Sequence, residues 1–574
     1  MDHGFDYHAE LIQRHIELVP SYEAVRKAWL PEIDVGPDTI REILGAAAQF
    51  AEGRMVAVNR EGDAQGCRFE HGRVLTPDGY KQMWKEITEG AWNCIDQPAE
   101  YGGQGLPSFV NAACRELFDR ACMAIGMLTG PTRAGSLLLD FGAPTLKDEW
   151  LPKFCSGEWS ATICISEADA GSDVGRIRTR ATRSPSGDWV VNGEKMWTSF
   201  GDNDLVERIG HFLLARTTDA PAGTAGLSLF LVPNKMRDAA GGWVSNGVVL
   251  RRIEEKLGLH GSPTCAMGFE NARAYLLGKL HRGLPQMFLM IQSMRLMVAI
   301  EGIGMSFGAE QTALRYASER RQGGNHAGPP VAIERHSDIQ RQLLGLAARV
   351  EVLRGLVYDL VLRIDAEKCG AASGDEHADV TQWLLPITKA SCAEAAFEIP
   401  SAAIQVLGGA GYTREWPCEQ WLRDARMMSI AEGSTGIQAL DLLHRRLWRD
   451  EGRSLSHFID NATKEIGAAD PIVAGPALLV LKRLKRVGRH LLEQEERPRD
   501  AEAGATSFLQ LAMLAATSWI AVRLVADARS DATARRLAAA GRFWLSDVDA
   551  RAALQESEAL AGCARLTDFD DIKV

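Results

Sequence analysis

The stretch WSATICISEADAGSD, residues 159–173, is where the sequence changes from helical to β texture. Its apolar run ends in a hydroxyl, an acid and a turn of small residues, as expected where a strand leaves a sheet. Before it, residues 1–158 keep apolar side chains at 3.6-residue spacing, which predicts a helical domain. After it, residues 159–282 contain short apolar runs such as HFLLART and SLFLVP, separated by turn-forming stretches such as SPSGD. This pattern predicts a β domain of barrel or sandwich type.

Helical spacing returns after the β region and continues to the C-terminus. It predicts a helical domain over residues 283–452 and an appended helical domain over residues 453–574. The run Phe508–Val525 is apolar enough to pass for a membrane span, but it contains Gln510 and Arg523, and an arginine is costly in lipid. We therefore expect a buried or dimer-facing helix there, and no membrane span. The predicted fold class is α+β multidomain, with helical, β, helical and appended helical domains in chain order.

The composition is that of an acidic globular protein. The chain has 574 residues, with 64 Lys and Arg against 75 Asp and Glu, so its formal net charge is −11. This balance argues against bulk binding to nucleic acid or to anionic membranes. The 11 cysteines form no CxxC pair, and no HExxH motif or Cys/His cluster suggests a metal site. The polar N-terminus, MDHGFDYHAELIQRH, lacks the apolar core of a signal peptide, so we expect a cytoplasmic protein with reduced thiols.

Two stretches of the β region combine hydroxyls with groups suited to a flat, polar ligand. The first is Cys164–Asp173, CISEADAGSD, in which hydroxyls and free backbone N–H groups at a strand end suit a polar ring edge or an amide. In the second, Lys195–Ser199, KMWTS, the aromatic ring can stack on a ligand while a hydroxyl bonds to its rim. Alone, the first stretch fits a tight turn with an Asp cap equally well, and the second favours a half-buried core Trp.

Two glycine-rich stretches interrupt the helical region that follows. Gln405–Tyr412 reads QVLGGAGY and Ile430–Gln438 reads IAEGSTGIQ, and glycine permits close approach of the backbone to a cofactor. In the second stretch, Glu432 lies between an apolar run and a small-residue loop. Partial desolvation there is expected to raise the pKa of the carboxyl and make it a usable base. The alternative is an acidic residue near a helix N-terminus, which is common.

The order and spacing of these motifs resemble the acyl-CoA dehydrogenase family. CISEADAGSD is similar to the first signature of that family. Residues 405–426, QVLGGAGYTREWPCEQWLRDAR, are similar to the second, with residues 430–438 as its base loop. The resemblance covers nearly the whole chain and is closest to the long subgroup that includes 3-methylmercaptopropionyl-CoA dehydrogenase. It implies a four-helix bundle over residues 283–452 and an extra helical domain over residues 453–574.

The resemblance implies an FAD enzyme of fatty acid β-oxidation that converts an acyl-CoA to its trans-2-enoyl-CoA. Glu432 would remove the α-proton while the β-hydride passes to flavin N5. The thioester carbonyl would be polarised by the N–H of Glu432 and by a flavin ribityl hydroxyl. Some members carry the base on an earlier helix, directly before the arginine that corresponds to Arg295. Met294 stands at that position here and cannot take a proton, so the base is assigned to Glu432.

The resemblance also implies the binding residues, the partners and the oligomer. The residues expected to bind FAD are Ile165, Ser166, Ser172, Trp197, Ser199, Arg320, Gln405, Gly408, Gly409 and Ser434. The residues expected to contact acyl-CoA are Ser172, Met294, Arg295 and Gly433. Because four of the first set, Arg320 among them, would reach the FAD of a neighbouring subunit, we expect a homodimer or a dimer of dimers. We expect electron-transfer flavoprotein as the electron acceptor.

Departures from the family pattern leave the acyl group and the acceptor open. Ser166 and Ser199 stand where the family usually has Thr, and Ala431 stands where a Tyr is usual, which removes a ring from the pocket. One alternative is an acyl-CoA oxidase that uses oxygen, which peroxide yield in air would reveal. Another is a DNA-associated, catalytically weak relative, which the net charge of −11 and the presence of Glu432 disfavour.

Overall fold

The computed structural model describes residues 7–30 and 33–573, which belong to two compact units. The first, here called the helical unit, comprises the described residues within 1–46, 107–116 and 298–574. The second, the mixed unit, comprises residues 47–106 and 117–297. The first six residues, part of the polar segment behind the cytoplasmic expectation, lie outside the described residues.

The mixed unit begins with helices, as predicted for this part of the chain. Its elements ahead of the main sheet are the π-helical turn Ala51–Met55, α4 (Val56–Gln65), the hairpin of β1 (Arg68–Glu70) and β2 (Arg73–Leu75), α5 (Tyr80–Glu89), α7 (Gly135–Phe141) and α8 (Pro144–Cys155). Three helices have residues in both units: α3 (Pro37–Phe50), α6 (Ser108–Thr132) and α9 (Gly283–Glu319). α6 is kinked at Cys122, whose backbone is not helical.

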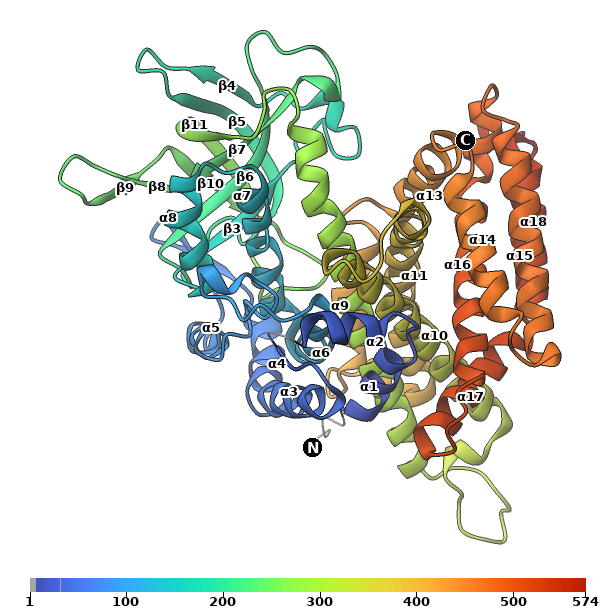
Figure 1. The fold of residues 1–574 in the computed structure, drawn as a ribbon. Coiled ribbons are helices and arrows are strands. Elements are labelled where there is room, and N and C mark those ends of the chain that lie inside the picture. Colours follow the sequence, from blue (N-terminus) through green and yellow to red (C-terminus); the bar gives the residue numbers. More distant parts are fainter. Residues whose placement is uncertain (1–6, 31–32, 574) are drawn as a thin grey trace. The chain divides into compact units, whose positions relative to one another are not determined.

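The predicted β region is confirmed as a seven-stranded mixed sheet, in which five strands form a closed ring (Figure 1). In the ring, β11 pairs with β5, β5 with β4, β4 with β6, β6 with β7, and β7 with β11. The strands are β3 (Trp159–Cys164), β4 (Arg180–Arg183), β5 (Trp189–Ser199), β6 (Arg208–Arg216), β7 (Leu227–Pro233), β10 (Val248–Ile253) and β11 (Thr264–Leu277), with a hairpin of β8 (Lys235–Arg237) and β9 (Trp243–Ser245). β3 joins the ring in parallel at β6, and β10 joins it at β11.

Two apolar clusters hold the mixed unit together. One lies among the strands of the ring and includes Leu213, Phe230 and Phe269, all fully or almost fully buried. The other joins α7, α8 and the first turns of α9 to the sheet and includes Trp150 and Met294. Because close-packed interiors transmit strain and resist deformation, the strand ends that carry the predicted site motifs stand on a rigid support.

In the helical unit, several long helices pack against α16 (Figure 1). Its helices are α1 (Ala9–Glu17), α2 (Tyr22–Trp29), α10 (Ser337–Lys368), α11 (Asp375–Leu407), α12 (Cys418–Ala425), α13 (Thr435–Leu443), α14 (Arg453–Ile466), α15 (Pro471–Leu492), α16 (Pro498–Val525), α17 (Ala532–Leu545) and α18 (Val548–Ala561). α16 packs against α10, α13, α15, α17 and α18. The last five helices therefore share one compact unit with α10 and α11, and the division of the chain into four domains stays a prediction.

Two helices, α9 and α16, are long and apolar enough to cross a membrane by length and composition alone. In their most apolar windows, 67% of α9 and 78% of α16 is buried inside the protein. Burial on most sides is typical of a core helix. The run Phe508–Val525 lies within α16, so the prediction that it is a buried helix is confirmed.

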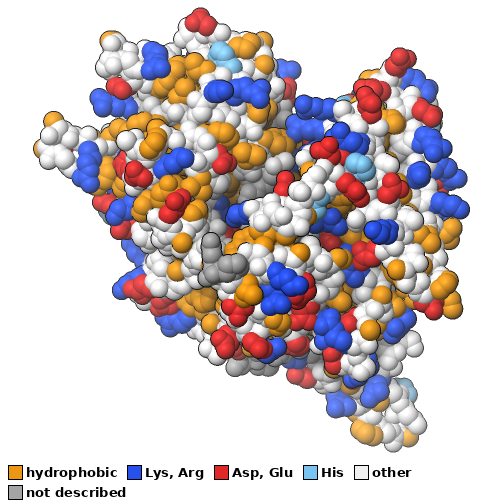
Figure 2. Space-filling view, viewed as in Figure 1, with side chains coloured by type: hydrophobic (Ala, Val, Ile, Leu, Met, Phe, Trp, Pro, Cys, Tyr) orange, Lys and Arg blue, Asp and Glu red, His pale blue; other side chains and the backbone are white. Residues whose placement is uncertain are grey.

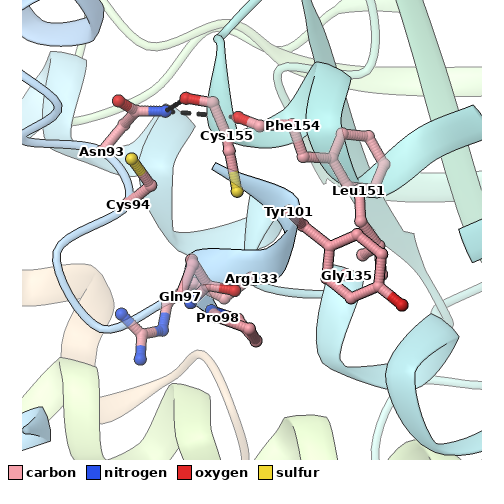
Figure 3. A pocket seen from close by; sticks show the side chains of 10 residues that line it. All are labelled: Asn93, Cys94, Gln97, Pro98, Tyr101, Arg133, Gly135, Leu151, Phe154 and Cys155. Carbon is pink, nitrogen blue, oxygen red and sulfur yellow. Dashed lines mark hydrogen bonds between the residues drawn. The ribbon is translucent and has the colours of Figure 1, made fainter. Parts of the chain in front are cut away.

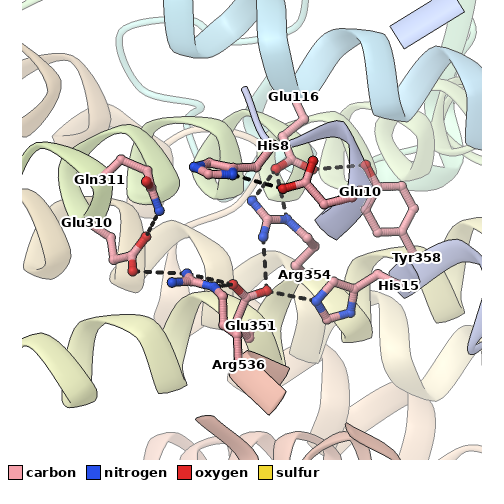
Figure 4. Close-up of polar contacts among 10 residues, drawn as sticks. All are labelled: His8, Glu10, His15, Glu116, Glu310, Gln311, Glu351, Arg354, Tyr358 and Arg536. Atoms are coloured by element: carbon pink, nitrogen blue, oxygen red, sulfur yellow. Dashed lines mark hydrogen bonds and ion pairs between the residues drawn. The ribbon is translucent and has the colours of Figure 1, made fainter. Parts of the chain in front are cut away.

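A network of buried charges joins helices that are far apart in the sequence (Figure 4). Glu351 of α10 is bonded to His15 of α1 at 2.8 Å, to Arg354 at 3.0 Å and to Arg536 of α17 at 2.8 Å. Arg536 also donates to Glu310 of α9 at 2.9 Å. Buried charges are tolerated only when they are paired and hydrogen-bonded, and here one guanidinium of α17 serves carboxylates on two other helices.

The protonation of this network follows from its contacts. No described residue hydrogen-bonds the buried Nδ1 of His15, so the neutral ring carries its proton on Nε2 and donates it to Glu351. Burial lowers the pKa of His15. Burial alone would raise the pKa of Glu351, but Arg536 and Arg354 hold it far below its usual range. The network is therefore assembled around an ionised Glu351 and a neutral His15.

Arg523 of α16 is neutralised in the same way. It donates to Asp359 of α10 at 2.8 Å and to Glu465 of α14 at 2.6 Å. The arginine that makes α16 a poor membrane span thus joins three helices inside the unit. On the face shown in Figure 2, exposed charges of both signs are interspersed.

Replacing Arg536 by Met should lower the free energy of unfolding by about 3 kcal/mol, because it leaves the buried Glu310 without its cation. The matched control is Arg535→Met on the same helix, whose side chain is exposed and which should cost less than about 0.5 kcal/mol. Urea unfolding followed by circular dichroism measures both. Equal losses in the two variants would show that the buried network does not stabilise the unit.

Candidate active site

A β-bulge turns Trp197 out of the sheet. The register of β5 against β11 shifts between Cys265 and Met267, so Met196 and Trp197 of β5 oppose one residue of β11. Trp197 has a φ of +61°, a left-handed backbone that a bulky residue rarely adopts. Its side chain is 58% exposed. Bulges re-aim side chains beside active sites, and the effect of this one is to present an indole ring at the end of β5.

Two serines lie near Trp197 along the backbone of β5 and across from it. Ser199 ends β5, and the carbonyl of Ser166, which follows β3, accepts a hydrogen bond from Met196 N at 3.0 Å. Across residues 7–30 and 33–573, neither serine hydroxyl makes a hydrogen bond within the protein. A hydroxyl is both donor and acceptor, so these two groups can bond to the rim of a ligand that stacks on Trp197.

A buried ion pair holds the loop that carries Ser166. The ammonium of Lys195, on the inner face of β5, donates to Glu167 Oε1 at 2.8 Å and to the carbonyl of Ile165 at 3.0 Å. Glu167 also accepts from Thr179 Oγ1 at 2.6 Å and from Arg178 N at 2.6 Å. Burial alone would raise the pKa of Glu167, but Lys195 and these hydrogen bonds hold it below its usual range. The carbonyl of the predicted cofactor residue Ile165 is therefore engaged within the protein.

A neutral polar cluster ties the same strands together. Cys164 Sγ of β3 lies 3.6 Å from Thr198 Oγ1 of β5, and Thr162 Oγ1 lies 2.7 Å from His211 Nδ1 of β6. Burial raises the pKa of the Cys164 thiol and lowers the pKa of His211 to about 3. Because both groups are uncharged near pH 7, the cluster supports the strands and supplies neither a thiolate nor an imidazolium.

The predicted acyl-CoA residues of the mixed unit differ in their surroundings. Ser172 is exposed in the loop after β3. Met294 is buried in the apolar cluster, where a Cβ added to Gly130 would come within 3.4 Å of its Cε. Arg295 is also buried, with its guanidinium carbon 5.5 Å from the centre of the Phe288 ring. Their roles at the acyl-CoA stay predictions.

In the helical unit, Gln405, Gly408 and Gly409 lie at the end of α11. Gly408 ends the helix with a φ of +62°, and a Cβ added at either glycine would meet no atom within 4 Å. Gln405 lines a groove of about 550 Å³ with residues of α10 and α11, a volume within the range of small-molecule sites. Arg320 is exposed just after α9. These four predicted cofactor residues thus have solvent-open positions.

Glu432 lies in a tight turn ahead of α13. Its φ is +54°, and Gly433 follows with a φ of +87°, so two successive residues are left-handed. The Glu432 side chain is half-buried. Ser434 caps α13, because its Oγ accepts a hydrogen bond from Ile437 N at 3.4 Å. The serine predicted to contact the cofactor therefore also starts the helix that follows the predicted base.

Two side chains that the motif analysis did not select hold this turn. The ammonium of Lys389, buried in α11, donates to the carbonyls of Met428 and Gly433 at 2.8 Å and of Ala431 at 2.9 Å. Gln438 Nε2 donates to the carbonyls of Glu432 at 3.1 Å and of Gly433 at 3.0 Å. A signal for Lys389 exists in the sequence: it stands in the apolar run LLPITKASCA with no acid three or four residues away. Such a lysine needs partners elsewhere in the fold.

A small cavity of about 20 Å³ lies within the mixed unit (Figure 3). Cys94, Tyr101, Arg133 and Cys155 are among its lining residues, and none of the predicted site residues is. Its volume suits about one water molecule, far less than a flavin or an acyl chain. In the described part of the chain, no group of three or more His, Cys, Asp or Glu side chains is placed to hold a metal ion.

Family models for the acyl-CoA dehydrogenases match three consecutive segments of the chain. The N-terminal domain model matches residues 37–158, the middle domain model residues 162–272 and the C-terminal domain model residues 281–447. Together these segments cover more than half of the chain.

Individual relatives agree with the family models. The chain is 35% identical to 3-methylmercaptopropionyl-CoA dehydrogenase of Ruegeria pomeroyi over 520 residues, which is 88% of this chain and 87% of that protein. It is 33% identical to a broad-specificity linear acyl-CoA dehydrogenase of Mycobacterium tuberculosis, over 74% of this chain and 72% of that protein. In fold it is similar to Caenorhabditis elegans ACDH-11 in complex with C11-CoA, with a TM-score of 0.77, 19% identity, and coverage of 91% of this chain and 89% of that one.

Replacing Glu167 by Gln should lower the free energy of unfolding at pH 7 by about 3 kcal/mol, because it leaves Lys195 buried without its counter-ion. Since the pKa of Glu167 is lower in the folded protein than in the unfolded chain, its contribution is complete above about pH 5 and is lost as the pH falls through the folded pKa. The variant should therefore lose less stability than the wild type between pH 5 and pH 3.

The matched control is Glu194→Gln, on the exposed face of the same strand, which should cost less than about 1 kcal/mol. Denaturant unfolding at several pH values measures all three proteins. Parallel pH dependence of Glu167→Gln and wild type would mean that this carboxylate does not titrate as the ion pair requires.

Proposed function

Because the chain belongs to the acyl-CoA dehydrogenase family, whose members are oxidoreductases acting on CH–CH groups, we propose that it oxidises an acyl-CoA thioester to the trans-2-enoyl-CoA with bound FAD. Glu432 is the proposed base. The observation that carries this assignment is the turn itself. The backbone of the half-buried Glu432 is left-handed, and five hydrogen bonds from Lys389 and Gln438 anchor the surrounding backbone.

The residues present fit a flavin. The exposed indole of Trp197 offers a stacking surface, and the unbonded hydroxyls of Ser166 and Ser199 offer donors and acceptors for the edge of a polar ring. Gly408 and Gly409 leave open space where a Cβ would stand, as close approach of a phosphate or ribose to the backbone requires. When bound, FAD supplies the two-electron acceptor for the β-hydride.

The chemistry left to the protein is proton removal and carbonyl polarisation. Glu432 removes the α-proton as its carboxylate and becomes a neutral carboxylic acid. Its backbone N–H donates to the thioester oxygen, on which negative charge develops as the proton leaves. Met294, at the alternative position for the base, is an apolar side chain packed in the core cluster and accepts no proton.

The same proposal covers the partners. Arg320, Gln405, Gly408 and Gly409 are exposed in the chain alone, which supports a homodimer in which they bind the FAD of the partner subunit. We propose electron-transfer flavoprotein as the acceptor and the cytoplasm as the location. The preferred acyl group is to be identified with a panel of straight, branched, thioether and aryl acyl-CoA thioesters, which are compared by the rate at which each bleaches the flavin.

Replacing Glu432 by Gln should leave FAD and acyl-CoA bound but slow the anaerobic bleaching of the flavin by roughly 10²- to 10⁴-fold, the usual contribution of a general base. Stopped-flow absorbance with the best thioester of the panel measures the rate. The matched control is Glu451→Gln, an exposed glutamate of the same unit that also has a left-handed backbone, with a φ of +56°.

Wild-type rates in Glu432→Gln would place the base elsewhere. No bleaching of the wild type by any thioester would overturn the proposed reaction. Stoichiometric peroxide on turnover in air, with no electron transfer to electron-transfer flavoprotein, would replace the proposed acceptor by oxygen.

Replacing Arg320 by Ala should weaken FAD binding by roughly 10- to 100-fold, because it removes a charge-assisted hydrogen bond to the cofactor. Flavin content after dialysis measures FAD occupancy, and light scattering on protein eluted from a size-exclusion column measures the oligomeric state. Arg499→Ala, another exposed arginine of the helical unit, is the control and should retain full occupancy. A monomeric protein that keeps full FAD in the Arg320 variant would contradict both the role and the shared site.

A further inference from the structure

Lys389 is a buried cation that the proposed reaction does not use directly. It lies in the middle of α11, fully buried, and its three N–H donors meet three backbone carbonyls between residues 428 and 433. An ammonium has three donors and no acceptor, so this arrangement satisfies the group completely. The carbonyls come from the turn that carries Glu432 and from the segment that leads into it. Lys389 therefore holds that backbone at three points.

Glu432 needs such support because its backbone is strained. A non-glycine residue with a φ near +54° costs of order 1–3 kcal/mol and persists only where the surroundings over-determine it. Lys389 bonds the carbonyls on either side of Glu432, those of Ala431 and Gly433. Gln438, also fully buried, bonds the carbonyl of Glu432 itself. The conformation of the residue is thus specified from both of its peptide bonds.

We propose that Lys389, assisted by Gln438, is a positioning residue that holds Glu432 in its left-handed conformation and so fixes the carboxylate against the α-carbon of the bound thioester. This inference rests on the proposed function. Without the ammonium, the carbonyls of Met428 and Ala431 lose the donor that they share, and the carbonyl of Gly433 keeps only Gln438. The turn can then relax to an unstrained backbone that points the carboxyl elsewhere. Since a misplacement of about 1 Å can cost about 10²-fold in rate, the loss falls on the chemical step.

The test compares four holoenzymes: wild type, Lys389→Met, Gln438→Leu and Arg536→Met. In Lys389→Met, the Met side chain fills the space of the Lys side chain without its charge. In Gln438→Leu, the amide is removed while the ammonium of Lys389 stays in place. Arg536→Met removes a half-buried cation of the same unit whose partners, Glu310 and Glu351, lie outside the turn. Anaerobic stopped-flow over a range of acyl-CoA concentrations gives the limiting rate of flavin bleaching and the half-saturating concentration. Flavin content and thermal midpoint are measured on the same samples.

We expect Lys389→Met to lower the limiting rate by about 10²-fold and Gln438→Leu by about 10-fold, with half-saturating concentrations within about threefold of wild type. Arg536→Met should lose thermal stability and keep the wild-type limiting rate. If the role of Lys389 is merely structural, Lys389→Met should lower the thermal midpoint and leave the limiting rate per bound flavin unchanged.

A limiting rate of Lys389→Met within threefold of wild type would overturn the inference, and so would an equal loss in Arg536→Met. If Lys389→Met does not retain FAD, Gln438→Leu decides: a reduced limiting rate supports the inference, and an unchanged one overturns it. A wild type that is not bleached by any thioester refutes the proposed function instead, so the two failures are distinguishable.

Discussion

A backbone that turns sharply inside a protein must find donors for every carbonyl that it directs inward. In the segment Met428–Gly433 that demand falls largely on one ammonium group. Because Lys389 lies on the long helix α11, the position of the turn depends on a helix that packs against α10, α12, α13 and α14, and α13 begins at the turn with Ser434 as its cap. The position of the predicted base is therefore a consequence of helix packing, transmitted mainly through Lys389 and assisted by Gln438.

The mixed unit uses the same device in a different setting. There the ammonium of Lys195 binds both a carboxylate and a carbonyl of the loop after β3, and the bulge in β5 exposes Trp197 two residues later. In both units a buried lysine bonds backbone carbonyls of a segment that carries predicted site residues. Preorganised donors of this kind cost no reorganisation when a substrate binds, which is the main way in which a protein environment stabilises developing charge.

The order of helical, β and helical regions could be predicted from the sequence because each depends on local periodicity. The motifs also selected Trp197 and Glu432 as candidate site residues, since an aromatic beside hydroxyls and an acid in a glycine-rich loop are local patterns; their roles stay predictions. The bulge at Trp197 could not be predicted, because it is a property of the register between β5 and β11, which are far apart in the chain. The partners of Lys389 could not be predicted for a related reason. They are backbone carbonyls, which every residue carries, so no complementary residue type marks them in the sequence.

Met294 shows that a motif can select a residue without predicting its contacts. The family pattern selects it by position, and the structure places it in the apolar cluster of the mixed unit, where its contacts are those of a core methionine. Its place in the motif predicts a role at the acyl-CoA, whereas its contacts in the fold show how it packs, and the two are separate observations.

The pairing of Arg536 with Glu310 has a consequence for how the protein is made. The two residues are 226 positions apart in the chain. At a synthesis rate of about 5–20 residues per second, roughly 10–45 s pass between the addition of the glutamate and the addition of its arginine. During that interval the carboxylate has no cation to accompany it into the interior, and an ionised carboxylate resists burial. The packing of Glu310 against α17 is therefore completed only after Arg536 has been added, and a chain whose synthesis stalls before α17 lacks the guanidinium that Glu310 binds in the fold.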